Sequence, residues 1–208
     1  MKTRDALSLL FAASFLALAA AAAQAEHPPG PPPPPALMQQ MRAGGLVLYL
    51  RHAMTERKPD AEPLDLDACP TQRNLSDEGR EASRAIGREL RRLGIPVGAV
   101  RASPFCRTRE TAYLAFGAAR TEPALLSRGN PKDPEELRRR SGLAMLLSTP
   151  PGAGTNAVLV GHSGLLDLLA KVHVDEAEMA VFQPLGGGRY KFLARIRADQ
   201  WKGLSPPR

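Results

Sequence analysis

Two unbroken apolar runs constrain the fold of this chain more than any other feature. They occupy residues 45–50 (GLVLYL) and, within the segment 156–161 (NAVLVG), the residues that follow Asn156. A strand with one face in water alternates apolar and polar residues, whereas a continuous apolar run of this length is typical of a parallel strand buried on both faces. The chain is therefore expected to form a sheet with helices packed on both sides of it.

Amphipathic segments supply those helices. The clearest helix is predicted to begin after Ser76 as the N-cap, with Asp77 and Glu78 in its first turn, and to stop at Gly94. Its apolar stripe consists of Ala82, Ile86, Leu90 and Leu93. Further helices are expected over about 107–116, 133–147 and 164–172, with a short strand at 97–102.

The C-terminal part is predicted to form a hairpin. Two strand-like segments, 179–183 and 190–196, are joined by a turn at Gly186-Gly-Gly188. Together these elements predict an α/β three-layer sandwich with a mostly parallel sheet, helices on both faces and an antiparallel C-terminal edge hairpin. The folded domain is expected to span residues 41–200, followed by a tail at 201–208.

The N-terminal segment has the composition of a secretory signal peptide. Lys2 and Arg4 precede an apolar run, and Ala23-Gln24-Ala25 is a small-x-small cleavage site, so residues 1–25 are predicted to be removed on export. The alternative is an uncleaved membrane anchor. Residues 26–40, rich in proline, are expected to be an extended spacer. The mature protein is thus predicted to be periplasmic or secreted, with no integral membrane segment.

Composition narrows the class of partner. The chain has 28 Lys and Arg against 21 Asp and Glu, a formal charge of +7, which favours an anionic partner. Two cysteines exclude a disulfide-rich scaffold and a four-cysteine zinc site. A low aromatic content of 5% and the predicted export both argue against nucleic acid.

Basic residues follow the predicted buried strands. In open α/β sheets, ligands bind at the carboxyl ends of the strands. The first run ends in Arg51-His52, the strand at 97–102 leads into Arg107, and the run at 156–161 ends before His162. Two arginines and two histidines at one sheet edge need a neutralising anion, because clustered buried charge is costly by itself. The pattern predicts a phosphate site.

Three motifs carry a resemblance to a known family. They are Leu48-Tyr-Leu-Arg-His-Ala53, Ser103-Pro-Phe-Cys-Arg-Thr-Arg-Glu-Thr-Ala112 and Val160-Gly-His-Ser-Gly164. In order and spacing they resemble the signatures of the histidine phosphatase superfamily, in its phosphoglycerate-mutase-like branch, over residues 45–197. Within that branch the chain is most similar to small exported phosphatases with an Arg-His-Ala motif, including those acting on lipopolysaccharide core sugars.

The resemblance implies a role for each strand-end residue. His52 matches the nucleophile that becomes phosphohistidine, Arg51 and Arg107 match the phosphate-binding arginines, and His162 matches the second pocket histidine. Fixed cationic donors suit a phosphoryl group whose negative charge spreads over its oxygens during transfer. The expected activity is metal-independent and cofactor-free hydrolysis of a phosphomonoester, a phosphorylated small molecule or envelope phospho-sugar. The alternative is a catalytically inactive relative that binds a phosphorylated envelope ligand.

The general acid departs from the family pattern. Mutase-type relatives carry a Glu after the Arg-His-Gly motif, where Met54 stands here, and a second acid where Ser127 stands. A proton donor is still needed for an alkyl phosphate. The favoured candidate is Glu178, at the start of the edge strand, followed by Asp133 and Glu122. Without such an acid, the enzyme would prefer good leaving groups such as phosphohistidine or acyl phosphates.

The two cysteines, Cys69 and Cys106, both flank the predicted pocket. In an exported protein they are expected to form a disulfide that ties the long loop after His52 to the Arg107 segment. The alternative is a pair of free, partly buried thiols.

Overall fold

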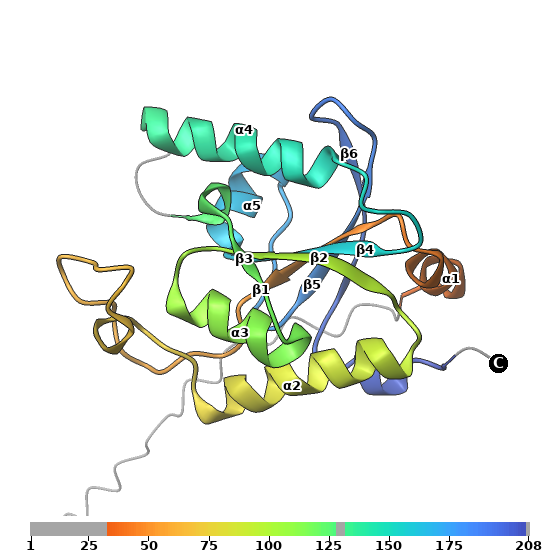
Figure 1. The fold of residues 1–208 in the computed structure, drawn as a ribbon, viewed down its shortest axis with the longest axis horizontal. Helices are drawn as coiled ribbons and strands as arrows, with labels where there is room; N and C mark the ends of the chain where they lie inside the picture. Colours follow the sequence, from red (N-terminus) through yellow and green to blue (C-terminus); the bar gives the residue numbers. More distant parts are fainter. Residues whose placement is uncertain (1–32, 128–131, 207–208) are drawn as a thin grey trace, which may run out of the picture. The chain divides into compact units, whose positions relative to one another are not determined.

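One mixed sheet runs through the part of the chain that the structure describes, residues 33–127 and 132–206 of a computed structural model (Figure 1). Its strand order is β3-β2-β4-β1-β5-β6. The strands are β1 (Val47–Arg51), β2 (Val97–Ala102), β3 (Arg120–Thr121), β4 (Asn156–Gly161), β5 (Met179–Pro184) and β6 (Tyr190–Ile196). The predicted signal peptide at 1–25 lies outside the described residues.

Pairing in the sheet changes from parallel to antiparallel at β1. Strands β1 and β4 pair in parallel, as do β2 with β4 and β2 with β3. Strand β5 pairs antiparallel with both β1 and β6. The β5–β6 turn contains Gly186, Gly187 and Gly188, all with positive φ (75°, 59° and 77°), a conformation that glycine adopts without a Cβ penalty. The predicted mostly parallel sheet with an antiparallel edge hairpin is confirmed.

Helices cover both faces of the sheet (Figure 1). They are α1 (Pro35–Ala43), α2 (Asp77–Arg92), α3 (Cys106–Phe116), α4 (Pro134–Ser148) and α5 (Ser163–Ala170), with short 3-10 turns η1 (Cys69–Thr71), η2 (Pro123–Leu125) and η3 (Trp201–Gly203). Leu48 and Leu50 of β1 pack into the core beneath α1, α2 and α3. Val47 and Tyr49 pack into the core beneath α4 and α5. This double burial explains the unbroken apolar run.

Helix α2 forms as its sequence predicts and lies close to the loop that follows β1. The Ser76 hydroxyl accepts a hydrogen bond from the Gly79 amide at 3.1 Å and caps the helix. The apolar residues Ile86, Leu90 and Leu93 are buried. A Cβ on Gly79 would collide with the carbonyl oxygen of Met54, so a glycine is needed where the helix meets this loop.

The ordered structure extends beyond the predicted limits of 41–200 at its N-terminal side. Residues 35–40, assigned to the proline-rich spacer, belong to helix α1, which begins with Pro35 at its first position, where proline is well tolerated. Leu37, Met38 and Met41 are buried against the core. Asn156 secures the helix end, because its Nδ2 donates to the Met41 carbonyl at 2.7 Å. The last prolines of the run therefore lead into a packed helix.

The C-terminal side also extends further than predicted. Trp201, assigned to a tail, opens η3 and is buried in the core that includes α2. Arg92 of α2 holds this segment, donating from Nη2 to the carbonyls of Trp201 (3.1 Å) and Leu204 (2.9 Å). Across residues 33–127 and 132–206, every helix is too short or too polar to cross a membrane.

Candidate active site

The ends of β1 and β4 bring two histidines together. The two strands are adjacent and in register, with Arg51 opposite Gly161. The chain therefore leaves both strands at the same edge, and the His52 amide donates to the Gly161 carbonyl at 3.1 Å. The rings of His52 and His162 lie edge to face, with centroids 5.4 Å apart.

His52 is held in the form that a nucleophile requires. Its ring is buried, and Nδ1 lies 2.9 Å from the Ala53 carbonyl oxygen. Because a carbonyl only accepts hydrogen bonds, Nδ1 carries the proton of the neutral ring, and Nε2 keeps its lone pair. Burial lowers the pKa of His52 to about 3; the bond to Ala53 opposes this, and the charges of Arg107 and Arg51 add to it.

His162 is fixed through its backbone and its ring. The Tyr49 hydroxyl accepts from the His162 amide at 3.0 Å and donates to its carbonyl at 2.8 Å. Nε2 lies 3.0 Å from the Ser103 hydroxyl, and the Phe105 ring packs edge-on with its centroid 5.0 Å away. Burial, followed by the influence of His52 and Arg107, lowers the pKa of His162 well below its usual value. Both pocket histidines are therefore neutral near pH 7.

Arg107 supplies a buried cation with a spare donor. It lies in the first turn of α3, and its guanidinium stacks over the Phe105 ring at 4.0 Å. Nη1 donates to the Asp60 carboxylate at 3.0 Å and to the Arg73 carbonyl at 3.3 Å. Nε is buried and has no hydrogen-bond partner in the described part of the chain. Because buried donors are almost always paired, an anion beside Nε would complete the site.

Arg51 lies at the end of β1 and remains partly accessible. Its Nη1 donates to the Val174 carbonyl at 3.0 Å, which ties the strand end to the loop before β5. Its Nη2 is 3.8 Å from the Glu176 carboxylate. The charges of Arg51 and Arg107 both act on the two histidine rings. The structure thus brings together all four strand-end residues that the sequence analysis selected.

Two further charged residues act on the site from the loop between β1 and α2, and neither was predicted from the sequence. Asp60 holds Arg107, and it also accepts from the Arg73 amide at 2.8 Å. The positive charge of Arg73 also lowers the pKa values of His52, His162 and Arg107. These residues lie in an irregular polar stretch, where sequence periodicity carries no positional information.

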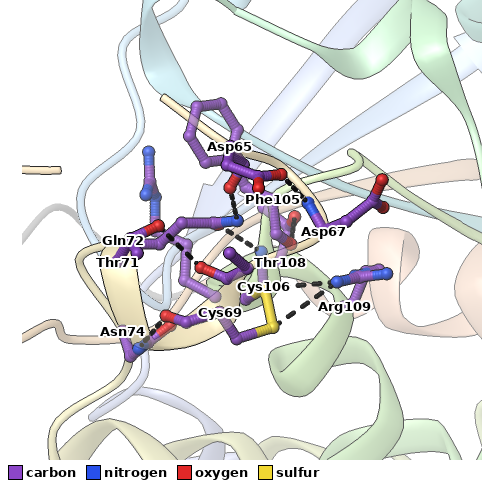
Figure 2. Close-up of a disulfide and its surroundings, with 12 residues drawn as sticks. Asp65, Asp67, Cys69, Thr71, Gln72, Asn74, Phe105, Cys106, Thr108 and Arg109 are labelled. Carbon is purple, nitrogen blue, oxygen red and sulfur yellow. Dashed lines mark hydrogen bonds between the residues drawn. A yellow bond between two sulfur atoms is a disulfide. The ribbon is translucent and has the colours of Figure 1, made fainter. Parts of the chain in front are cut away.

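A disulfide fastens this loop to the start of α3, as predicted (Figure 2). It joins Cys69 to Cys106, the residue before Arg107. The buried Gln72 side chain adds a second link by accepting from the Cys106 amide at 2.9 Å. Arg109 covers the bridge, with Nη2 3.2 Å from the Cys106 sulfur. The loop that carries Asp60 and the helix that carries Arg107 are therefore joined covalently.

The carboxylates expected to act as general acids are engaged elsewhere. Glu178 accepts from the Asp175 amide at 2.8 Å and lies 3.8 Å from Arg195. Glu122 caps η2 and pairs with Arg101 at 2.9 Å. Asp133 caps α4. Among the described residues, no hydrogen bond or ion pair joins any of the three to His52.

Glu176 is the carboxylate that the structure brings to the pocket. Its Oε1 is 3.9 Å from His52 Nδ1 and accepts a hydrogen bond from the Thr55 hydroxyl at 3.0 Å. The backbone accounts for this placement, because the neighbouring Ala177 amide donates to the His52 carbonyl at 3.1 Å. Ala177 has a φ of 63°, so the chain turns sharply between Glu176 and Glu178. No sequence signal marked this turn, since its residue is not glycine.

Across 33–127 and 132–206, His, Cys, Asp and Glu side chains form no group of three or more arranged to hold a metal ion.

Fold and site together define an α/β protein with two neutral histidines and two arginines at the carboxyl edge of its parallel strands, an arrangement suited to holding an anion. Residues 47–128 match the model of the histidine phosphatase superfamily (branch 1), and that segment contains two of the three motifs. Over these residues the family match therefore agrees with the resemblance predicted from the motifs, a similarity to branch 1 of the histidine phosphatase superfamily.

Solved structures share this fold at low sequence identity. The protein histidine phosphatase SixA, solved with tungstate, superposes with a TM-score of 0.54 at 17% identity, over 74% of this chain and 97% of that one. A mycobacterial glucosyl-3-phosphoglycerate phosphatase gives 0.52 at 17% identity, over 71% and 96%. A phosphoserine phosphatase from Entamoeba histolytica, solved with 3-phosphoglyceric acid, gives 0.52 at 10%, over 75% and 98%. Comparison with curated protein sequences found no match.

Proposed function

We propose that this protein is an exported, metal-independent phosphatase that hydrolyses a phosphomonoester through a phosphohistidine on His52. The observation that carries the proposal is the unpaired, buried Nε of Arg107 beside two neutral histidines. A phosphoryl group supplies the acceptor that this nitrogen lacks, and His52 Nε2 supplies the lone pair that attacks it. The phosphatases named among the structural neighbours support the same reaction class.

The proposed reaction has two in-line displacements. In the first, His52 Nε2 attacks phosphorus, the N–P bond forms and the bond to the ester oxygen breaks. In the second, water attacks phosphorus, the N–P bond breaks and inorganic phosphate leaves. Arg51 and Arg107 bind the equatorial phosphoryl oxygens in both steps, where negative charge is greatest. Burial and the neighbouring arginines keep the His52 ring neutral at the start of the cycle.

Asp60 assists by orienting Arg107. Its carboxylate engages Nη1 of the guanidinium, so the side of the fork that carries Nε is left for phosphate. A planar guanidinium held at one edge can present its remaining donors as a bidentate pair. In the free protein this ion pair also offsets part of the cost of burying the charge.

Export is proposed on two grounds. Residues 1–25 have the charge and apolar pattern of a signal peptide. A disulfide between Cys69 and Cys106 is also typical of proteins that fold in an oxidising compartment. A periplasmic or secreted phosphatase of this kind would act on a phosphorylated small molecule or an envelope phospho-sugar.

The direct test measures p-nitrophenyl phosphate hydrolysis by the wild type, His52→Ala and, as a matched control, His173→Ala, with and without EDTA. The His173 ring is exposed and pairs with Asp167 and Asp175, not with His52 or His162. We expect the His52 variant to lose at least about 10³-fold in rate, the control to keep its rate, and EDTA to have no effect. Acid-labile phosphate trapped on His52 would identify the nucleophile. Phosphate binding without turnover in the wild type would instead support an inactive ligand-binding relative.

A further inference from the structure

Glu176 lies beside His52 and is partly exposed to solvent. Its side chain is 25% exposed, whereas His52 is 2% exposed. Its contacts with Thr55 (3.0 Å), Arg51 (3.8 Å) and His52 (3.9 Å) are all made by Oε1. Oε2 therefore has no hydrogen bond within the described residues. This carboxylate therefore lies next to the Nδ1 side of the His52 ring and near Arg51, and part of it contacts solvent.

The backbone around Glu176 is anchored to the nucleophile segment at several points. The Ala177 amide donates to the His52 carbonyl at 3.1 Å, and the Arg51 side chain donates to the Val174 carbonyl at 3.0 Å. The Thr55 hydroxyl also donates to the Glu176 carboxylate. These contacts fix the position of the side chain relative to His52, as proton transfer to a bound group requires.

The other carboxylates near the pocket are already occupied. Both oxygens of Asp60 contact Arg107 Nη1, at 3.0 and 3.4 Å, and one of them also accepts from the Arg73 amide. Glu178 binds the Asp175 amide and faces Arg195. Glu176 has one hydrogen bond and only long contacts to cations. It is the carboxyl group best placed to exchange a proton with a ligand.

We propose that Glu176 is the catalytic acid and base of this site, and that the substrates are phosphate esters of alcohols. This inference rests on the proposed phosphatase function. Departing alkoxides are poor leaving groups and need a proton, whereas phosphohistidine and acyl phosphates release better leaving groups that depend on a donor far less. A carboxyl group held beside the nucleophile therefore favours alcohol esters as substrates, such as phosphorylated sugars, over activated phosphoryl compounds.

In the proposed reaction, Glu176 both donates a proton and regains one in each catalytic cycle. As His52 Nε2 bonds to phosphorus and the ester P–O bond breaks, Glu176 gives its proton to the departing oxygen. Glu176, now ionised, then takes a proton from the water whose oxygen attacks phosphorus. The N–P bond breaks, its electron pair returns to Nε2, and Glu176 is protonated again. One water is consumed, and one alcohol and one phosphate are released.

The experiment compares leaving groups. The kcat/KM is measured for glycerol 2-phosphate, an alkyl ester, and for p-nitrophenyl phosphate, whose phenolate leaves readily. Wild type, Glu176→Gln and the matched control Glu178→Gln are assayed with both substrates. We expect Glu176→Gln to lower kcat/KM for the alkyl ester by about 10²-fold or more, and for the aryl ester by less than about tenfold. Glu178→Gln should change the two values by the same factor.

The same assay separates the inference from the function on which it rests. Because kcat/KM covers only the steps up to release of the leaving group, attack by water does not contribute. Equal losses on both substrates in Glu176→Gln, or a selective loss in Glu178→Gln, would overturn the assignment of Glu176. Absence of labelled phosphohistidine in the wild type would instead overturn the proposed function. Glu176→Asp, which keeps the carboxyl group, should recover part of the alkyl-ester activity and guards against loss of folding.

Discussion

Removing the Cys69–Cys106 disulfide should destabilise the protein substantially. The bridge joins residues separated by 37 positions in the sequence. Closing a loop of that length lowers the entropy of the unfolded chain by an amount worth about 4 kcal/mol near 25 °C. The double variant Cys69→Ser/Cys106→Ser is therefore expected to lose about 4 kcal/mol of unfolding free energy and about 10 °C in Tm, given the size of the folded part.

Loss of the bridge should also weaken the site. The loop it holds carries Asp60, which binds Arg107, and Arg73, whose charge acts on both pocket histidines. When the loop moves more freely, Arg107 is less well oriented for an anion. We expect the inhibition constant of inorganic phosphate to rise about tenfold, which corresponds to about 1.4 kcal/mol of binding free energy.

The assay is urea unfolding followed by far-UV circular dichroism, with phosphate inhibition measured on the same samples. Wild type reduced by a phosphine should match the untreated double variant, and the reductant should leave the double variant unchanged. If the unfolding midpoints of the oxidised wild type and the double variant coincide, the entropic argument is refuted. If stability falls but phosphate affinity does not, the loop does not orient Arg107.

Two further predictions concern the histidines. Because burial lowers the pKa of folded His52 to about 3 while the unfolded ring titrates near pH 6.5, stability should fall as the pH drops below about 6.5. The titration of His52 should lower the free energy of unfolding by about 2 kcal/mol between pH 7.5 and 5. The measurement is urea unfolding of the wild type and His52→Gln at both pH values. Equal pH dependence in the two proteins would contradict the prediction. Tyr49→Phe leaves the buried backbone amide and carbonyl of His162 without their partner, and should cost about 2 kcal/mol or more in unfolding free energy. It should also lower kcat, and an unchanged unfolding curve would show that Tyr49 does not hold His162.

Much of the fold could be predicted because local patterns and tertiary burial agree. Strands β1 and β4 are apolar on both faces because both faces are covered, and α2 carries its cap and stripe in its own sequence. Helix α1 was missed because prolines lead into it, although its buried Leu37, Met38 and Met41 lie at helical spacing. A proline run marks where a helix can begin as well as where one cannot continue.

The site residues also fall into two groups, those that strands place and those that loops place. Arg51 is the last residue of β1, and His52 and His162 directly follow β1 and β4, so the sheet itself determines where they lie. Glu176 and Glu178 are two positions apart in a loop, and the turn at Ala177 decides which one faces His52. A positive φ at a non-glycine residue leaves no mark in the sequence, because the surrounding contacts impose it. The positions of site residues in loops could therefore not be predicted from the sequence and are known only from the structure.

The burial of Trp201 has a practical consequence. It is the single tryptophan in the chain, and it lies in η3, within the core that includes α2, held there by Arg92. Intrinsic tryptophan emission thus reports on one event, the docking of the C-terminal segment onto α2. A red shift that precedes the loss of helical signal would show that this segment detaches before the sheet unfolds, and identical transitions would show that it belongs to the same cooperative unit.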